Sequence, residues 1–272
     1  MTYNWKGAKQ VAVAGTEEKC AFTLVVGVSA SGDALPFQVV YKGKTSVSLP
    51  VKTATNSAVW AATQNLGFCF DFSGNDTYWS TLSTMKTYVN KIIAPYFDKA
   101  CAELGFPIDQ LEIWQIDAWS VHRSVEFHTW MVEHHSNIQL DFVPGSCTGL
   151  WQPCDVRIQR LIKHEIRRAA RVDVIVETLN LLELEEATSS KSKSGISNVS
   201  AIILEKGIKT LQDQTVGWLV KSFNMINRTD FIQKVSAAIV HSSAFLLIYA
   251  NYRHLNGVTL KNSRVLTFHM QV

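Results

Sequence analysis

Cysteine is scarce and irregularly placed in this chain of 272 residues. The chain has five cysteines, with no C-x-x-C pair and no histidine at zinc-finger spacing: Cys20, Cys69, Cys101, Cys147 and Cys154. An odd and scattered set argues against a disulfide framework or a structural zinc site. We therefore expect reduced thiols in an intracellular protein.

Long apolar runs are missing as well. The longest, from Val235 to Ala250, contains a histidine and two serines and falls short of the roughly 18 to 20 apolar residues that a membrane span needs. Lys6 and Lys9 are not followed by the apolar segment of a signal peptide. The sequence thus predicts no membrane partner.

Neither charge sign dominates. Lysine and arginine number 26 against 23 acidic residues, a formal net charge of +3, and 47% of the residues are hydrophobic. This composition excludes a disordered or low-complexity chain. It permits a nucleic-acid partner wherever the basic residues cluster.

The first third of the chain has the pattern of strands. Residues 10–14, 21–28 and 36–41 are β-branched or aromatic runs separated by short turns, which predicts an antiparallel meander. From Thr77 to Leu104 the apolar spacing becomes helical, with a break expected at Pro95.

Strands and helices then alternate. We expect strands at 111–117 and 137–143 and helices at 125–135 and 153–171. This alternation predicts parallel pairing and an α/β fold with an antiparallel group of strands at its front.

The composition changes after this alternation and suggests four regions. We predict a core over 1–186, a polar linker over 187–200, a helical tail of one or two short helices over 201–236, and a segment of no recognisable pattern over 237–272. A misread or decayed reading frame would account for the last segment.

Two aspartates stand where an α/β sheet binds ligands. Asp117 ends the apolar strand LEIWQID, and Asp155 opens the helix that follows the next strand and loop. Either acid alone has an ordinary explanation, a turn for Asp117 and the helix macrodipole for Asp155. Together they would meet at one crevice, where oxygen ligands suit Mg²⁺ or Mn²⁺.

The segments around both acids resemble a known family. The stretch Asp117-Ala-Trp-Ser-Val-His122, followed by FVPGSCTGLWQPCDV ending just after Asp155, is similar to the DDE superfamily endonuclease domain of pogo-like and mariner-like transposases, in a fungal version. Early segments such as WKGAKQV and LPFQVVYKG, and the later LQDQTVGWLV, fit the same family.

The resemblance implies an RNase H-like fold, a mixed sheet flanked by helices with a helical C-terminal extension. It also implies three acids that hold two divalent ions for DNA cleavage and strand transfer. Asp117 matches the second acid and Asp155 the third. The family's opening strand, with the first acid, has no counterpart before Trp5, and we interpret Glu17 and Glu18 as turn residues rather than ligands.

A basic helix follows Asp155 and is the candidate DNA-binding element. Its cations include Arg157, Arg160, Lys163 and Arg167, which would either contact phosphates or form an ordinary solvated face. His122 would orient a carboxylate, contact a phosphate, or simply form hydrogen bonds within its loop. Trp119 and Trp151 are candidates for base stacking.

These expectations combine into one functional hypothesis. We expect a nuclear, transposon-derived DNA-binding domain whose ancestral reaction is strand cleavage and transfer with Mg²⁺ or Mn²⁺, inactive in this chain because the first acid is absent. The alternative is a domesticated DNA-binding or scaffolding protein without catalysis. Oligomeric state is not readable from the sequence.

Overall fold

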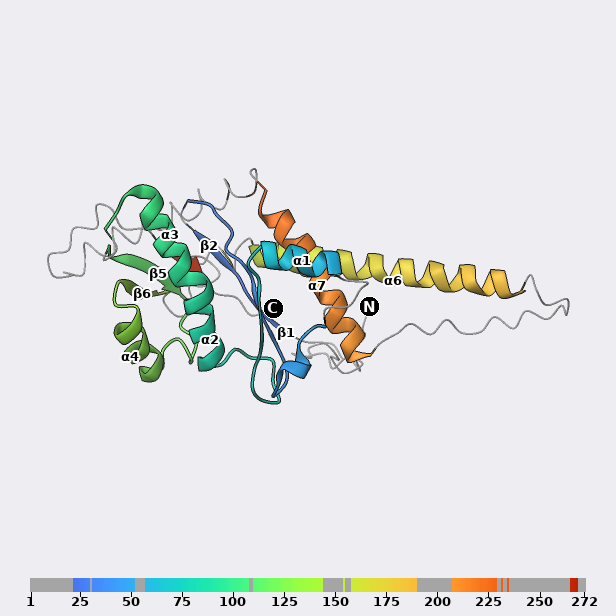
Figure 1. Ribbon diagram of the computed structural model, residues 1–272, viewed down its shortest axis with the longest axis horizontal. Coiled ribbons are helices and arrows are strands. Elements are labelled where there is room, and N and C mark those ends of the chain that lie inside the picture. The colour runs from blue at the N-terminus through green and yellow to red at the C-terminus, as the bar shows by residue number, and fades with distance from the viewer. Residues whose placement is uncertain are drawn as a thin grey trace, which may run out of the picture.

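The computed structural model shows a mixed sheet with helices packed on both of its faces (Figure 1). The structure describes residues 22–29, 31–51, 57–107, 110–143, 154, 158–189, 207–228, 231, 234 and 265–268, with the backbone alone at 185–189 and 265–268. The strands are β1 (Phe22–Val25), β2 (Gly27–Ser29), β3 (Gln38–Tyr41), β4 (Cys69–Phe72), β5 (Glu112–Ile116), β6 (Ile138–Phe142) and β7 (Val265–Phe268). The α-helices are α1 (Ser57–Asn65), α2 (Leu82–Tyr88), α3 (Ala94–Leu104), α4 (Val125–His134), α6 (Gln159–Ser189) and α7 (Ile208–Ile226).

Two strand ladders share one bent segment. The first has the order β1-β3-β4 and the second β2-β7-β5-β6. Only the buried Val26 separates β1 from β2, so one stretch of chain supplies a strand to each ladder. The predicted antiparallel pairing at the front is confirmed for β1 with β3, and the predicted parallel pairing is confirmed for β5 with β6.

Strand β7 is the main departure from the expected organisation. It pairs antiparallel with β2 and parallel with β5, and therefore lies inside the second ladder. Residues 237–272 show no recognisable pattern in the sequence, and a run as short as four residues does not by itself identify a strand. Residues 265–268 form a strand because they pair with β2 and β5, which are distant in the sequence.

The helix predicted over 77–104 has the expected interruption. Helix α2 is capped by Thr81, whose hydroxyl and that of Thr84 form a reciprocal capping box. A π-helical segment, η3 (Val89–Ile93), then leads into α3 just before Pro95, and Gly105 ends α3 with a φ of 68°. Because proline cannot donate a backbone hydrogen bond, the wider π turn accommodates it.

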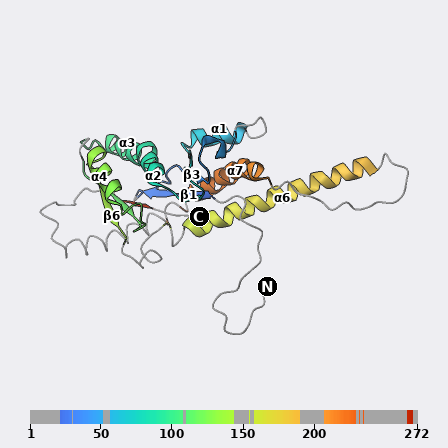
Figure 2. The ribbon, with the colours of Figure 1, turned by 90° about the horizontal axis from the view of Figure 1, so that it is seen from below.

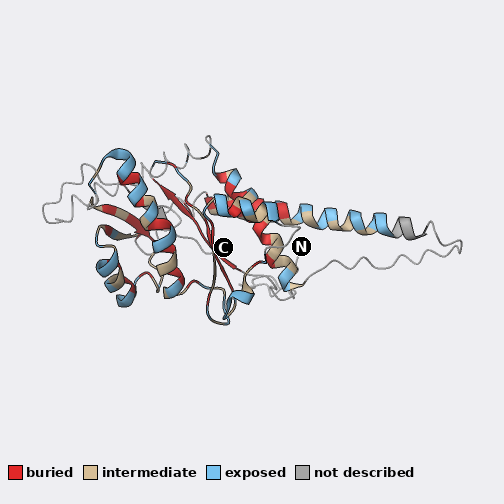
Figure 3. Ribbon diagram, in the orientation of Figure 1, coloured by how far each residue is buried: buried red, intermediate tan, exposed pale blue. Residues whose placement is uncertain are grey.

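Two apolar clusters pack on the two faces of the sheet (Figure 3). Alternate residues of β1 point in opposite directions, so Leu24 joins the cluster with α6 and α7 whereas Val25 joins the cluster with α2, α3 and β5. The phenol of Tyr41 and the hydroxyl of Thr215 hydrogen bond at 2.6 Å and tie β3 to α7. Trp114, fully buried on β5, anchors the second cluster.

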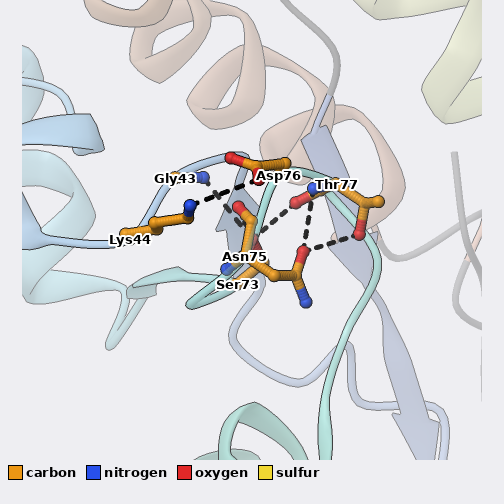
Figure 4. Close-up of polar contacts among 6 residues, drawn as sticks. All are labelled: Gly43, Lys44, Ser73, Asn75, Asp76 and Thr77. Atoms are coloured by element: carbon orange, nitrogen blue, oxygen red, sulfur yellow. Dashed lines mark hydrogen bonds and ion pairs between the residues drawn. The ribbon is translucent and has the colours of Figure 1, made fainter.

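The loops after β3 and β4 are held together by polar contacts (Figure 4). The hydroxyl of Ser73 accepts from the amide of Gly43, and the amide and hydroxyl of Thr77 both donate to Asn75 Oδ1. Gly43 has a φ of 150°, and a Cβ built on it would lie 1.7 Å from the Oγ of Ser48. Only glycine satisfies both conditions there.

Helix α6 is longer than predicted and projects from the body of the molecule (Figures 1 and 2). The sequence predicted a helix that ends at Arg171, where a β-branched run begins. The observed helix continues to Ser189. Its first half packs against α7, and Asp173 accepts a hydrogen bond from Trp218 Nε1 at 2.6 Å. The α7 region is one helix of 19 residues, whereas one or two short helices were expected.

Candidate acidic site and nucleic-acid interface

Asp117 directly follows β5, as predicted. Strand β5 lies between β7 and β6 and is parallel to both, so Asp117 stands at the carboxyl end of an interior strand. The side chain is 26% exposed, which leaves it accessible from solvent. Open α/β sheets place their ligand sites at this edge.

His122 fixes the orientation of this carboxylate. Its Nδ1 lies 2.7 Å from Asp117 Oδ1 and 3.3 Å from the Asp117 carbonyl oxygen, which requires the proton on Nδ1. The ring is fully buried and packs edge-on against Trp119, with the centroids 5.4 Å apart. Of the roles considered for His122, the geometry supports carboxylate orientation. Contact with a DNA phosphate does not fit a fully buried ring.

The second predicted acid, Asp155, lies outside the described residues, as do Arg157 and Trp151. Its neighbours Cys154 and Ile158 are described, and both are fully buried in the cluster that contains Val26 and Val28. The chain at this point is therefore anchored against the bent segment shared by the two ladders.

Other carboxylates near β5 have structural partners. Gln115 Nε2 donates to Asp141 Oδ2 at 3.0 Å, between residues that are paired in the β5–β6 register. Burial raises the pKa of Asp141 above its ordinary value. The thiol of Cys101 donates to Glu112 Oε1 at 2.9 Å. Within the part of the chain that the structure describes, no three His, Cys, Asp or Glu side chains gather closely enough to hold a metal ion.

A basic stripe runs along the exposed side of α6. We define the basic stripe as Arg160, His164, Arg167 and Arg171, which are all exposed and which follow one another at intervals of four, three and four residues. This spacing places them on one line of the helix surface. The helix turns its opposite side, including Ile162 and Ile166, to the core. His164 was not among the predicted binding residues, although the spacing in the sequence could have identified it.

The remaining basic residues of α6 differ in their contacts. Lys163 flanks the basic stripe and is partly exposed. Arg168 is engaged within the helix, where its Nε and Nη2 donate to the two carboxylate oxygens of Glu165 at 2.8 and 2.6 Å. The hydrogen bonds from Arg168 lower the pKa of Glu165 despite its burial. Arg160, Lys163, Arg167 and Arg171 thus remain as the cations of this surface.

Two further observations concern the cysteines and the helices. The three described cysteines, Cys69, Cys101 and Cys154, are buried thiols. None of the described helices is long and apolar enough to cross a membrane.

The fold and the site define the class of this domain. It is an α/β domain with an oriented carboxylate at the end of an interior strand and with a basic helix later in the chain. The profile of the DDE superfamily endonuclease family matches residues 19–193, more than half of the chain, and the protein belongs to this family. Searches of curated proteins and of solved structures found no match. The family assignment confirms the resemblance and establishes descent from transposase-type nucleases, a family generally dependent on divalent metals. The mixed α/β architecture is compatible with an RNase H-like fold.

Proposed function

We propose that this protein is a transposase-derived domain that binds DNA through α6 and has lost efficient catalysis of the family's ancestral reaction, metal-dependent strand cleavage and transfer. The observation that carries the proposal is the basic stripe, because three arginines share one exposed line of a helix in a nuclease-family fold. A DNA-binding role places the protein in the nucleus.

The dimensions of the basic stripe suit a DNA backbone. From Arg160 to Arg171 the helix rises by about 16 Å, a length over which duplex DNA presents roughly ten phosphate charges. The contacts would be to phosphates, so binding would depend strongly on salt and little on sequence. Lys163 adds a fourth cation at the flank.

The acidic site fits part of a divalent-metal centre. Asp117 offers carboxylate oxygens at a solvent-accessible strand end, and His122 holds it in the way that buried partners orient metal ligands. Asp117 and Asp155 would hold Mg²⁺ or Mn²⁺. When bound, such ions stabilise the attacking and leaving oxygens of an in-line displacement at phosphorus.

The strand beside β5 is the reason for proposing lost catalysis. Strand β7 pairs with β5 in parallel and has the sequence Val-Leu-Thr-Phe, so it brings no carboxylate next to the strand of Asp117. A site with two carboxylates in place of three would position metal ions poorly, and small errors of position cost orders of magnitude in rate.

Nicking of supercoiled DNA in Mg²⁺ or Mn²⁺ tests the proposal when it is combined with binding measurements. We expect salt-sensitive binding without nicking by the unaltered protein. Nicking that Asp117→Asn or Asp155→Asn abolishes would refute the loss of catalysis while leaving the family fold in place. Absence of binding at low salt would refute the DNA-binding role.

A non-catalytic scaffolding role is the second candidate. The projecting half of α6 favours it, because Val172, Ile175 and Leu179 lie along one side of the helix and are exposed by 42%, 57% and 52%. Exposed apolar side chains in a row are typical of association surfaces. DNA binding that requires association of the protein would support this role.

A further inference from the structure

The projecting half of α6 has an apolar stripe with coiled-coil spacing. We define the apolar stripe as Val172, Ile175, Leu179 and Leu182, with exposed fractions of 42%, 57%, 52% and 40%. Intervals of three, four and three residues are those of heptad a and d positions. The stripe lies on the side of α6 opposite to the partly buried Asp173, Glu177 and Leu181.

We propose that this stripe is a self-association surface, on which a second copy of the chain packs its own α6 in antiparallel orientation. The positions permit this orientation, because they are symmetric about residue 177. Val172 and Leu182 lie five residues on either side of it, and Ile175 and Leu179 lie two residues on either side. A two-fold axis at residue 177 therefore brings Val172 against Leu182 of the second copy, and Ile175 against its Leu179. These are the a-with-d layers of an antiparallel pair.

The charges of α6 select the same orientation. The helix is basic before the stripe, with Arg167, Arg168 and Arg171, and turns acidic along it, with Glu177 and Glu183 followed in the sequence by two more glutamates. Antiparallel packing places the basic end of each helix near the acidic end of the other. Parallel packing would place like charges together, which is unfavourable.

The described residues leave this side of α6 uncovered. Helix α6 extends well beyond the sheet in both orientations of the molecule (Figures 1 and 2), and α7 packs on the side that carries Asp173. A second copy on the opposite side would leave the sheet and the contacts of α7 intact. Arg160 and His164 lie outside the overlap, whereas Arg167 and Arg171 lie within it, so self-association and DNA binding share part of α6.

The mass of the full chain in solution, measured by light scattering over a series of concentrations without nucleic acid, tests the proposal. We expect a concentration-dependent dimer, and at least a tenfold weaker dimer for Ile175→Glu combined with Leu179→Glu. Val132→Glu is the matched control, because Val132 on α4 is 71% exposed and lies off the stripe. Circular dichroism of each variant verifies that it is folded.

Cross-linking of introduced cysteines tests the orientation. In the antiparallel pair, residue 178 of each copy lies next to the two-fold axis. The two residues 167 are separated by about 30 Å along the direction of the helices. A short bismaleimide should therefore link the Thr178→Cys variant into a dimer and leave Arg167→Cys unlinked, with the unaltered chain as the blank. Linking at both positions would refute the antiparallel arrangement.

A monomer at high-micromolar concentration in the light-scattering experiment would refute self-association. A dimer that persists in the glutamate variant would place the interface elsewhere.

Discussion

The DNA-binding proposal makes a quantitative prediction about salt. Four cations of α6 that are not paired with Glu165 form the proposed DNA-binding surface, namely Arg160, Lys163, Arg167 and Arg171. If each neutralises one phosphate, the logarithm of the affinity should fall with the logarithm of the salt concentration with a slope of about −3.6. The affinity should then decrease roughly 150-fold between about 50 and 200 mM salt.

Removal of two of these cations should halve the slope. For Arg160→Ala combined with Arg167→Ala we expect a slope of about −1.8 and a decrease of roughly twelvefold over the same range. Fluorescence anisotropy with a labelled duplex measures both values. Lys44→Ala combined with Lys99→Ala is the control, since it removes the same charge from exposed sites on other elements, at 66% and 75% exposure.

The comparison of the two double variants decides between a local and a global charge effect. Equal loss of slope in both would show that net charge, and not the α6 surface, attracts the DNA. An unchanged slope in the α6 variant would refute the proposed interface. Two duplexes of unrelated sequence should give the same result, because phosphate contacts do not distinguish bases.

Three further predictions concern stability, each measured by urea unfolding. Gly43→Ala should lower the free energy of unfolding by about 2 to 3 kcal/mol, because the backbone conformation is disfavoured and the new Cβ overlaps Ser48. Gly74→Ala, also at positive φ but facing open space, should lower it by only about 1 kcal/mol. Equal effects would contradict the overlap. His122→Ala should cost about 3 kcal/mol through its cavity and its lost hydrogen bond to Asp117, and an unaltered stability would mean that the ring is not buried. Burial, with Asp71 nearby, raises the pKa of the Cys69 thiol from 9.0 to about 12, so the unfolded chain releases this proton first. The free energy of unfolding should therefore decrease as the pH rises above about 9, by at most about 1.4 kcal/mol per pH unit, and Cys69→Ala should lack this part of the decrease.

Local patterns predicted the elements that depend on local interactions. The strand ending at Asp117 and the helix beginning near Val125 occur within a residue or two of their predicted positions, because periodicity and capping determine them. Helix α1 and strand β4 were not predicted, since their short and mixed sequences gain order only by packing on β3 and α7. The continuation of α6 past Arg171 was also not predicted, because its β-branched residues obscured a helical spacing that is present in the sequence.

The candidate site was predictable in its residue types and less so in its contacts. Asp117 was identified from its place at a strand end, and the structure confirms that place. The burial of His122 depends on Trp119 and Phe127, whose rings enclose it only after the loop and α4 have packed together. No sequence spacing specifies such an enclosure. The metal-binding and DNA-binding roles of these residues stay predictions.

The position of β7 has a consequence for the synthesis of this protein. Residues 265–268 fill the gap between β2, near residue 28, and β5, near residue 114. A ribosome that adds residues from the N-terminus must therefore synthesise the chain beyond residue 268 before this ladder can close. Until then β2 and β5 present open edges, which are sites of aggregation, and closure over more than 230 residues is slow because distant segments must find one another. We expect the nascent chain to require chaperones, and a chain that lacks its last ten residues to accumulate in insoluble form.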